Sequence, residues 1–194
     1  MSNYFPLDTT FPWSKRSDGF LQYGEVFKDC IEAIIEKYAE NRPFHDYALA
    51  PIIFLLRQYI ELQLKGIIIM CKGSLPQPDK HHNIETLYND ALAAVDEKCG
   101  KENVGKANAD AEKFIKDLGK FDSKGEAFRY PETKGGEEYC KKISQADGWL
   151  YERLTAFDEF ADIAKKVIGD LEGIEAYLDI FDENEQEQFA NSGP

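Results

Sequence analysis

Three charged residues within an otherwise apolar segment are the first candidates for chemistry. Arg57, Glu61 and Lys65 follow one another at steps of four residues. Residues four apart lie on one face of a helix, so these side chains form a polar stripe and can pair with one another. Two interpretations follow. The stripe is either a ladder of ion pairs on a core helix or the lining of a groove, in which the arginine and the lysine hold a phosphate while the glutamate orients them.

Two adjacent histidines are the second candidate. His81 and His82 stand just before Asn83, a residue suited to begin a helix as its N-cap. Neighbouring residues cannot share one helix face, and no third ligand at a familiar spacing accompanies them, so we expect no metal site here. Phosphate-loop, dinucleotide-binding and nucleophile-elbow motifs do not occur in the sequence, and we therefore expect no cofactor.

The charged stripe belongs to a long, mostly apolar predicted helix. It begins near His45 or Asp46 and ends near Cys71, where Gly73 and two later prolines stop it. Apolar residues at steps of three and four predict four further helices, at about 18–39, 83–95, 102–118 and 150–181. We expect the helices at 45–71 and 83–95 to form an antiparallel hairpin. His82 would then lie nearer Lys65 than Arg57.

The predicted fold class is all-α, an antiparallel bundle of about five helices in one domain. The bundle spans residues 18–182 and follows an extended N-terminal arm, 1–17, whose aromatic residues dock on it. A glycine-rich loop or short hairpin is expected near 121–144, and a polar flexible tail at 183–194.

The composition narrows the class of partner. The chain has 36 acidic and 23 basic residues and a net charge of -13, so nucleic acid or a nucleotide could bind only through a local patch. The four cysteines have no metal or disulfide spacing and are typical of reduced thiols in the cytoplasm. We expect no membrane span, because Arg57, Glu61 and Lys65 interrupt the longest apolar segment.

Two stretches resemble a known family. The string LRQYIELQLK at 56–65, followed after a proline-containing loop by HNIETL at 82–87, resembles the core hairpin of bacterial HEPN-like proteins. The string FRYP at 128–131, after Asp122 and Ser123, is similar to a phrase in uncharacterised members. The resemblance covers about residues 48–92 and, more loosely, 121–131. It implies a HEPN-like bundle.

Many HEPN-like proteins are metal-independent ribonucleases of toxin, CRISPR-associated and phage-defence systems, and their signature is an arginine followed by four to six residues and a histidine. Here no histidine occurs in the six positions after Arg57. The resemblance therefore implies a non-catalytic binding or regulatory module of a defence, toxin–antitoxin or nucleic-acid-processing system, with a homodimer or protein partner. Its expected binding residues are Arg57, Glu61, Lys65, His82 and Arg129. The alternative is a divergent HEPN ribonuclease or nucleotide-modifying toxin with Arg57, Glu61 and His82 as catalytic residues.

Overall fold

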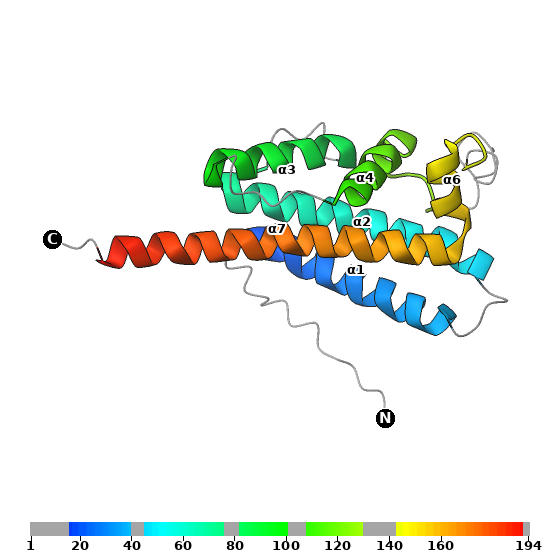
Figure 1. Cartoon of the computed structure of the whole chain (residues 1–194), viewed down its shortest axis with the longest axis horizontal. Coiled ribbons are helices and arrows are strands. Elements are labelled where there is room, and N and C mark those ends of the chain that lie inside the picture. Colours follow the sequence, from blue (N-terminus) through cyan, green and yellow to red (C-terminus); the bar gives the residue numbers. More distant parts are fainter. Residues whose placement is uncertain (1–15, 40–44, 76–81, 101–107, 130–142, 192–194) are drawn as a thin grey trace, which may run out of the picture.

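The structure is a computed structural model that describes residues 16–39, 45–75, 82–100, 108–129 and 143–191. These residues form six helices and no strand, so the all-α prediction is confirmed for this part of the chain (Figure 1). Of the predicted N-terminal arm, only its last two residues are described, and they belong to the first helix. None of the described helices is both long enough and apolar enough to cross a membrane.

Helix α2 (His45–Lys72) is the central element of the bundle. It contacts α1 (Arg16–Ala39), α3 (Ile84–Cys99), α6 (Gly148–Thr155) and α7 (Phe157–Asn191). Its apolar residues point in several directions, because a helix with neighbours on most sides needs apolar faces toward each of them. The side chains that it buries include Ile52, Leu56, Tyr59, Ile60, Leu64 and Ile67.

Helices α1 and α2 run antiparallel and pack closely. A Cβ atom added to Gly24 would lie 2.7 Å from Nε2 of Gln63, and one added to Gly66 would overlap the side chain of Leu21. Glycines on both helices therefore let the two backbones approach. Helix α7 lies beside α1, where Lys28 pairs with Glu172.

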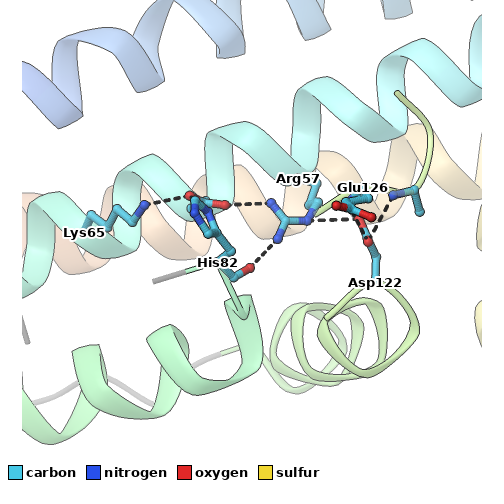
Figure 2. Close-up of polar contacts among 7 residues, drawn as sticks. Arg57, Lys65, His82, Asp122 and Glu126 are labelled. Atoms are coloured by element: carbon cyan, nitrogen blue, oxygen red, sulfur yellow. Dashed lines mark hydrogen bonds and ion pairs between the residues drawn. The ribbon is translucent and has the colours of Figure 1, made fainter. Parts of the chain in front are cut away.

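Helix α3 runs in the same direction as α2, so the predicted antiparallel hairpin is wrong. At its end, Lys98 Nζ donates to the carbonyl of Met70 at 3.2 Å, near the end of α2. Its start instead lies beside the middle of α2 (Figure 2). The predicted N-cap is confirmed, since Asn83 Oδ1 accepts from the backbone N–H of Thr86 at 3.1 Å.

Helix α4 (Ala109–Phe121) begins later than the predicted position 102. Asn108 caps it, and its Oδ1 accepts from the backbone N–H groups of Asp110 and Ala111. The backbone N–H of Asn108 itself donates to Asp170 Oδ1 on α7 at 2.7 Å. Side-chain capping together with this anchor sets the start of the helix.

The predicted last helix is two helices rather than one. The chain is extended at Ala156, between α6 and α7. On α6, the ring of Trp149 lies close to the cations of Lys113 and Arg153, at 4.3 and 4.0 Å from the ring centroid. Helix α7 then continues to Asn191, so its end lies beyond the predicted boundary near residue 182, and it projects past the other helices (Figure 1).

The segment after α4 is a series of turns over residues 122–129, with no strand in the described part. Two of its residues have left-handed backbone conformations: Gly125 with φ +66° and Phe128 with φ +66°. Phe128 is buried and stacks on Phe121, with ring centroids 6.0 Å apart. The remainder of the predicted loop, from 130 to 142, lies outside the described residues.

Candidate functional site

Arg57 is completely buried and contacts three separate parts of the chain (Figure 2). Its Nη1 donates to Glu61 Oε2 at 2.7 Å, one turn along α2. Its Nη2 donates to the backbone carbonyl of His82 at the start of α3. Its Nε lies 3.2 Å from Asp122 Oδ2, an ion pair that is not aligned as a hydrogen bond. One guanidinium thus joins α2, the start of α3 and the end of α4.

The carboxylate of Glu61 lies between three nitrogen-bearing side chains. Oε2 accepts from Arg57, while Oε1 accepts from Lys65 Nζ at 2.6 Å and lies 3.1 Å from His82 Nδ1. Burial by itself would raise the pKa of this carboxyl, but the hydrogen bonds from Lys65 and Arg57 outweigh burial and lower the pKa below its ordinary value. Glu61 is therefore a carboxylate at neutral pH.

Lys65 faces inward as well. Its side chain is 10% exposed, and its Nζ lies 5.9 Å from the ring centroid of Phe20 on α1. The ladder of ion pairs predicted for Arg57, Glu61 and Lys65 is confirmed. The groove interpretation requires both cations to face an incoming phosphate, and neither does in this arrangement.

The loop after α4 packs directly against the guanidinium. Asp122 Oδ1 accepts from the backbone N–H groups of Glu126 and Ala127 at 3.0 and 3.1 Å, which closes the loop. A Cβ atom on Gly125 would lie 2.6 Å from Cζ of Arg57. Only glycine fits at this position, both because of that contact and because its φ is positive.

Sequence reasoning did not assign Asp122 or Gly125 to the site. Asp122 appears there only as part of the family phrase, and Gly125 not at all. The available signal was local: an acidic residue at a helix end with a glycine three positions later, which is typical of a turn. That signal predicts the turn but not its partner, because Arg57 is far away in the sequence.

His82 is the exposed member of the cluster, with 67% of its side chain accessible. Its backbone carbonyl contacts Arg57, so the expectation that it lies nearer Lys65 than Arg57 is wrong, because α3 starts beside the middle of α2. In the tautomer that carries its proton on Nδ1, the imidazole donates to Glu61 and leaves Nε2 free to accept a proton.

Arg129 is not part of the ion pairs around Glu61. It is exposed, and its Cζ lies 5.8 Å from the ring centroid of Phe54 on α2. The structure therefore brings together four of the five predicted binding residues, Arg57, Glu61, Lys65 and His82, and places the fifth against an aromatic ring.

The charges inside the cluster balance. Arg57 and Lys65 supply two positive charges, and Glu61 and Asp122 supply two negative ones. The buried cluster is therefore neutral before His82 is counted, and its cations leave no excess charge for an anion. Within the described residues, no group of three or more His, Cys, Asp or Glu side chains could hold a metal ion.

Comparison with protein-family models, curated proteins and solved structures finds no match for this chain. The resemblance to HEPN-like proteins rests on the residues quoted from the sequence. The function is therefore inferred from the chemistry of the cluster.

Proposed function

We propose that the chain is a non-catalytic, HEPN-like binding or regulatory module of a defence, toxin–antitoxin or nucleic-acid-processing system. The observation that carries this proposal is the burial of Arg57, whose side chain has no exposed surface. A ribonuclease arginine must approach the phosphate of its substrate to stabilise the charge that develops there. Arg57 instead holds the carbonyl of His82 and the carboxylates of Glu61 and Asp122.

The charge of the chain supports a protein partner over a nucleic acid. Lys65, the other cation of the cluster, is also buried and paired. The chain as a whole carries a net charge of -13, which opposes association with phosphate chains. The partner is a second copy of the chain or another protein.

RNA cleavage by the purified chain tests the proposal. Labelled single-stranded RNA is incubated with the wild type, with His82→Ala and with Glu187→Ala as a control at an exposed position of α7. We expect the same background cleavage from all three proteins. Both substituted residues are exposed, so both variants should fold, and thermal melting checks this. Cleavage that His82→Ala removes and Glu187→Ala retains would contradict the proposal.

A second candidate function is a divergent HEPN ribonuclease or nucleotide-modifying toxin. The observation that favours it is the exposed imidazole of His82, whose Nδ1 lies 3.1 Å from the ionised carboxylate of Glu61. A carboxylate in that position holds Nδ1 of the ring toward itself, which leaves Nε2 to accept the proton of a ribose hydroxyl. Arg57 would then be a positioning residue, because it contacts the backbone of His82.

The RNA-cleavage assay also separates the two candidate functions, and a growth assay adds a second measurement. Expression of the wild type should arrest bacterial growth if the chain is a toxin, and His82→Ala should relieve that arrest. We expect no difference in growth between the wild type and His82→Ala. Growth arrest by the wild type alone would favour the toxin.

A further inference from the structure

Helix α1 places few apolar side chains in the core. Of its 24 residues, Ile31 and Ile35 are the large apolar ones whose side chains are buried, in the part of the helix that the structure describes. The shorter α3 buries Ile84, Leu87, Tyr88, Ala91, Ala94, Val95 and Cys99. Burial of apolar surface is the main favourable contribution to helix packing, so this contribution is smaller for α1 than for α3.

The face of α2 beneath α1 carries polar side chains. Tyr59 and Gln63 lie one turn apart on this face, and both are completely buried. A Cβ atom on Gly24 of α1 would lie 2.7 Å from Nε2 of Gln63, so α1 packs directly on that side chain. Burial raises the pKa of the Tyr59 hydroxyl, and so do the nearby carboxylates of Glu172 on α7 and Glu25 on α1. Tyr59 therefore lies where the three helices meet.

These polar groups have no hydrogen-bond partner among the described residues. The hydroxyl of Tyr59 and both the oxygen and the nitrogen of the Gln63 amide are buried and unpaired. A buried polar atom without a partner opposes the packed state, because it has lost its hydrogen bonds to water. Movement of α1 away from α2 would return those hydrogen bonds. The residues that α1 covers therefore favour its release.

Carboxylates crowd the contact between α1 and α7. Lys28 of α1 pairs with Glu25 on the same helix and with Glu172 on α7. Glu175, one turn beyond Glu172, is half-buried and forms no ion pair within the described part of the chain. Burial raises the pKa of the Glu175 carboxyl. Three neighbouring carboxylates raise it further and one ammonium group lowers it, in the order Asp179, Glu25, Glu172 and Lys28.

From these observations we infer that α1 opens from the bundle as a unit of its own, and that it opens less readily when Glu175 takes up a proton. Few buried apolar side chains, unpaired polar atoms under the helix and crowded carboxylates all reduce the free energy that keeps α1 closed. The opening uncovers Tyr59 and Gln63, while α2, α3, α4 and α7 keep their contacts with one another. The inference goes beyond the proposed function, because the opening requires no partner.

Protonation of Glu175 should hold α1 closed. The pKa of Glu175 in the closed form lies above the ordinary value of 4.5, so the protonated form suits the closed arrangement better. Its contribution to closure is complete below pH 4.5 and is lost as the pH rises through the raised pKa. The neighbouring group on α2 is the hydroxyl of Tyr59, which stays neutral because burial raises its pKa. Acid also weakens the ion pairs of Lys28, so the wild type must be compared with a Glu175 variant at each pH.

Amide hydrogen exchange tests the separate opening. Protection factors are measured by NMR for the middle of α1, residues 25–35, and for the middle of α3, residues 87–95. We expect the α1 amides to have protection factors at least about tenfold lower than those of the α3 amides, because they exchange through the local opening and not through global unfolding.

Two variants with the same chemical change separate local opening from global unfolding. Tyr59→Phe removes an unpaired buried hydroxyl under α1, and Tyr88→Phe removes one on α3, where Lys116 of α4 lies 5.8 Å from the ring centroid. We expect Tyr59→Phe to raise the protection factors of the α1 amides roughly fivefold or more. Tyr88→Phe should leave them unchanged, because Tyr88 stays covered when α1 opens. Both variants should raise the protection factors of the α3 amides.

The variant Glu175→Gln tests the dependence on pH. It removes the charge and keeps the size of the side chain. At about pH 7 we expect it to raise the protection factors of the α1 amides at least about threefold, since a crowded carboxylate is gone. At about pH 4 the wild type is itself largely protonated at Glu175, so the two proteins should have nearly the same protection factors. The control Glu187→Gln makes the same change at an exposed position of α7 and should have no effect at either pH.

Equal protection factors in α1 and α3 that respond alike to Tyr59→Phe and Tyr88→Phe would overturn the separate opening. An effect of Glu175→Gln that is absent at neutral pH, or equal at the two pH values, would overturn the role of Glu175. Circular dichroism checks that each variant folds. The RNA assay tests the proposed function independently, because it depends on His82 and not on α1.

Discussion

At the scale of single residues, the charged cluster around Arg57 has a structural role. A buried guanidinium has a large desolvation cost, which only close partners offset. Here Glu61, Asp122 and the carbonyl of His82 are those partners. Because they come from three segments, the arginine fixes how those segments meet.

Replacement of Arg57 by methionine tests this role. The variant Arg57→Met leaves Glu61 and Asp122 without their shared cation, and we expect it to lower the free energy of unfolding by about 3–5 kcal/mol. Urea denaturation followed by circular dichroism measures the change. The control Arg129→Met removes an exposed arginine and should change stability by less than about 0.5 kcal/mol. Equal effects would mean that Arg57 has no special structural role.

The pH dependence of stability tests the ionisation of Glu61. Its pKa in the folded protein lies below the ordinary value of 4.5, so the ionised form stabilises the fold. That contribution is complete above pH 4.5 and is lost as the pH falls from 4.5 through the lower folded pKa.

We therefore expect the difference in unfolding free energy between the wild type and Glu61→Gln to be constant from pH 6 to 8, to within about 0.5 kcal/mol, and to shrink below pH 4.5. Urea titrations at successive pH values measure it. A difference that grows toward acid would contradict the lowered pKa.

At the scale of elements, the loop after α4 packs closely against the guanidinium of Arg57. Gly125 approaches the guanidinium more closely than any side chain would allow, and Phe128 adopts a left-handed conformation that is uncommon for an aromatic residue. The loop conformation is therefore maintained by its contacts with Arg57 and Phe121 rather than by local preference.

The variant Gly125→Ala tests that fit. A Cβ atom there meets Arg57 and also strains the backbone at φ +66°, so we expect a loss of about 1–3 kcal/mol in unfolding free energy. The matched control is Gly169→Ala on α7, where an added Cβ meets nothing within 4 Å. That change should stabilise the helix by about 0.5–1 kcal/mol. Thermal and urea denaturation of both variants measure the change in unfolding free energy. A change of the same sign in the two variants would contradict the close fit of Gly125 to Arg57.

At the scale of the whole molecule, α7 belongs to the bundle for only part of its length. It buries residues from Phe157 to Leu178, and Lys98 of α3 holds Asp182 at 2.5 Å. From Glu183 to Ala190 every side chain is exposed. The last part of the helix therefore extends from the bundle instead of covering it (Figure 1).

A shortened chain tests this division. We expect a chain that ends at Asp182 to keep its unfolding free energy to within about 1 kcal/mol, because the side chains of residues 183–190 are exposed. A chain that ends at Glu175 also loses the buried Leu178 and should be less stable by about 2–5 kcal/mol. Urea denaturation compares the two. A large loss from the first truncation would show that the end of α7 supports the bundle.

The sequence predicted the helical elements well where their signals are local. The N-cap at Asn83 and the stripe of Arg57, Glu61 and Lys65 depend on residues three or four positions apart, and both predictions are confirmed. The start of α4 and the break at Ala156 were missed. Asn108, which caps α4, is anchored by its contact with Asp170 on α7, and the local sequence does not encode that contact.

The sequence by itself determined that this is a helical, strongly acidic protein whose longest apolar helix carries a ladder of three charged residues, because composition and spacing along the chain are enough for those conclusions. Only the tertiary structure decided that α3 runs parallel to α2, and that Asp122, Gly125 and His82 meet at Arg57. Those contacts join segments far apart in the sequence, and no local periodicity encodes the direction in which two helices pack.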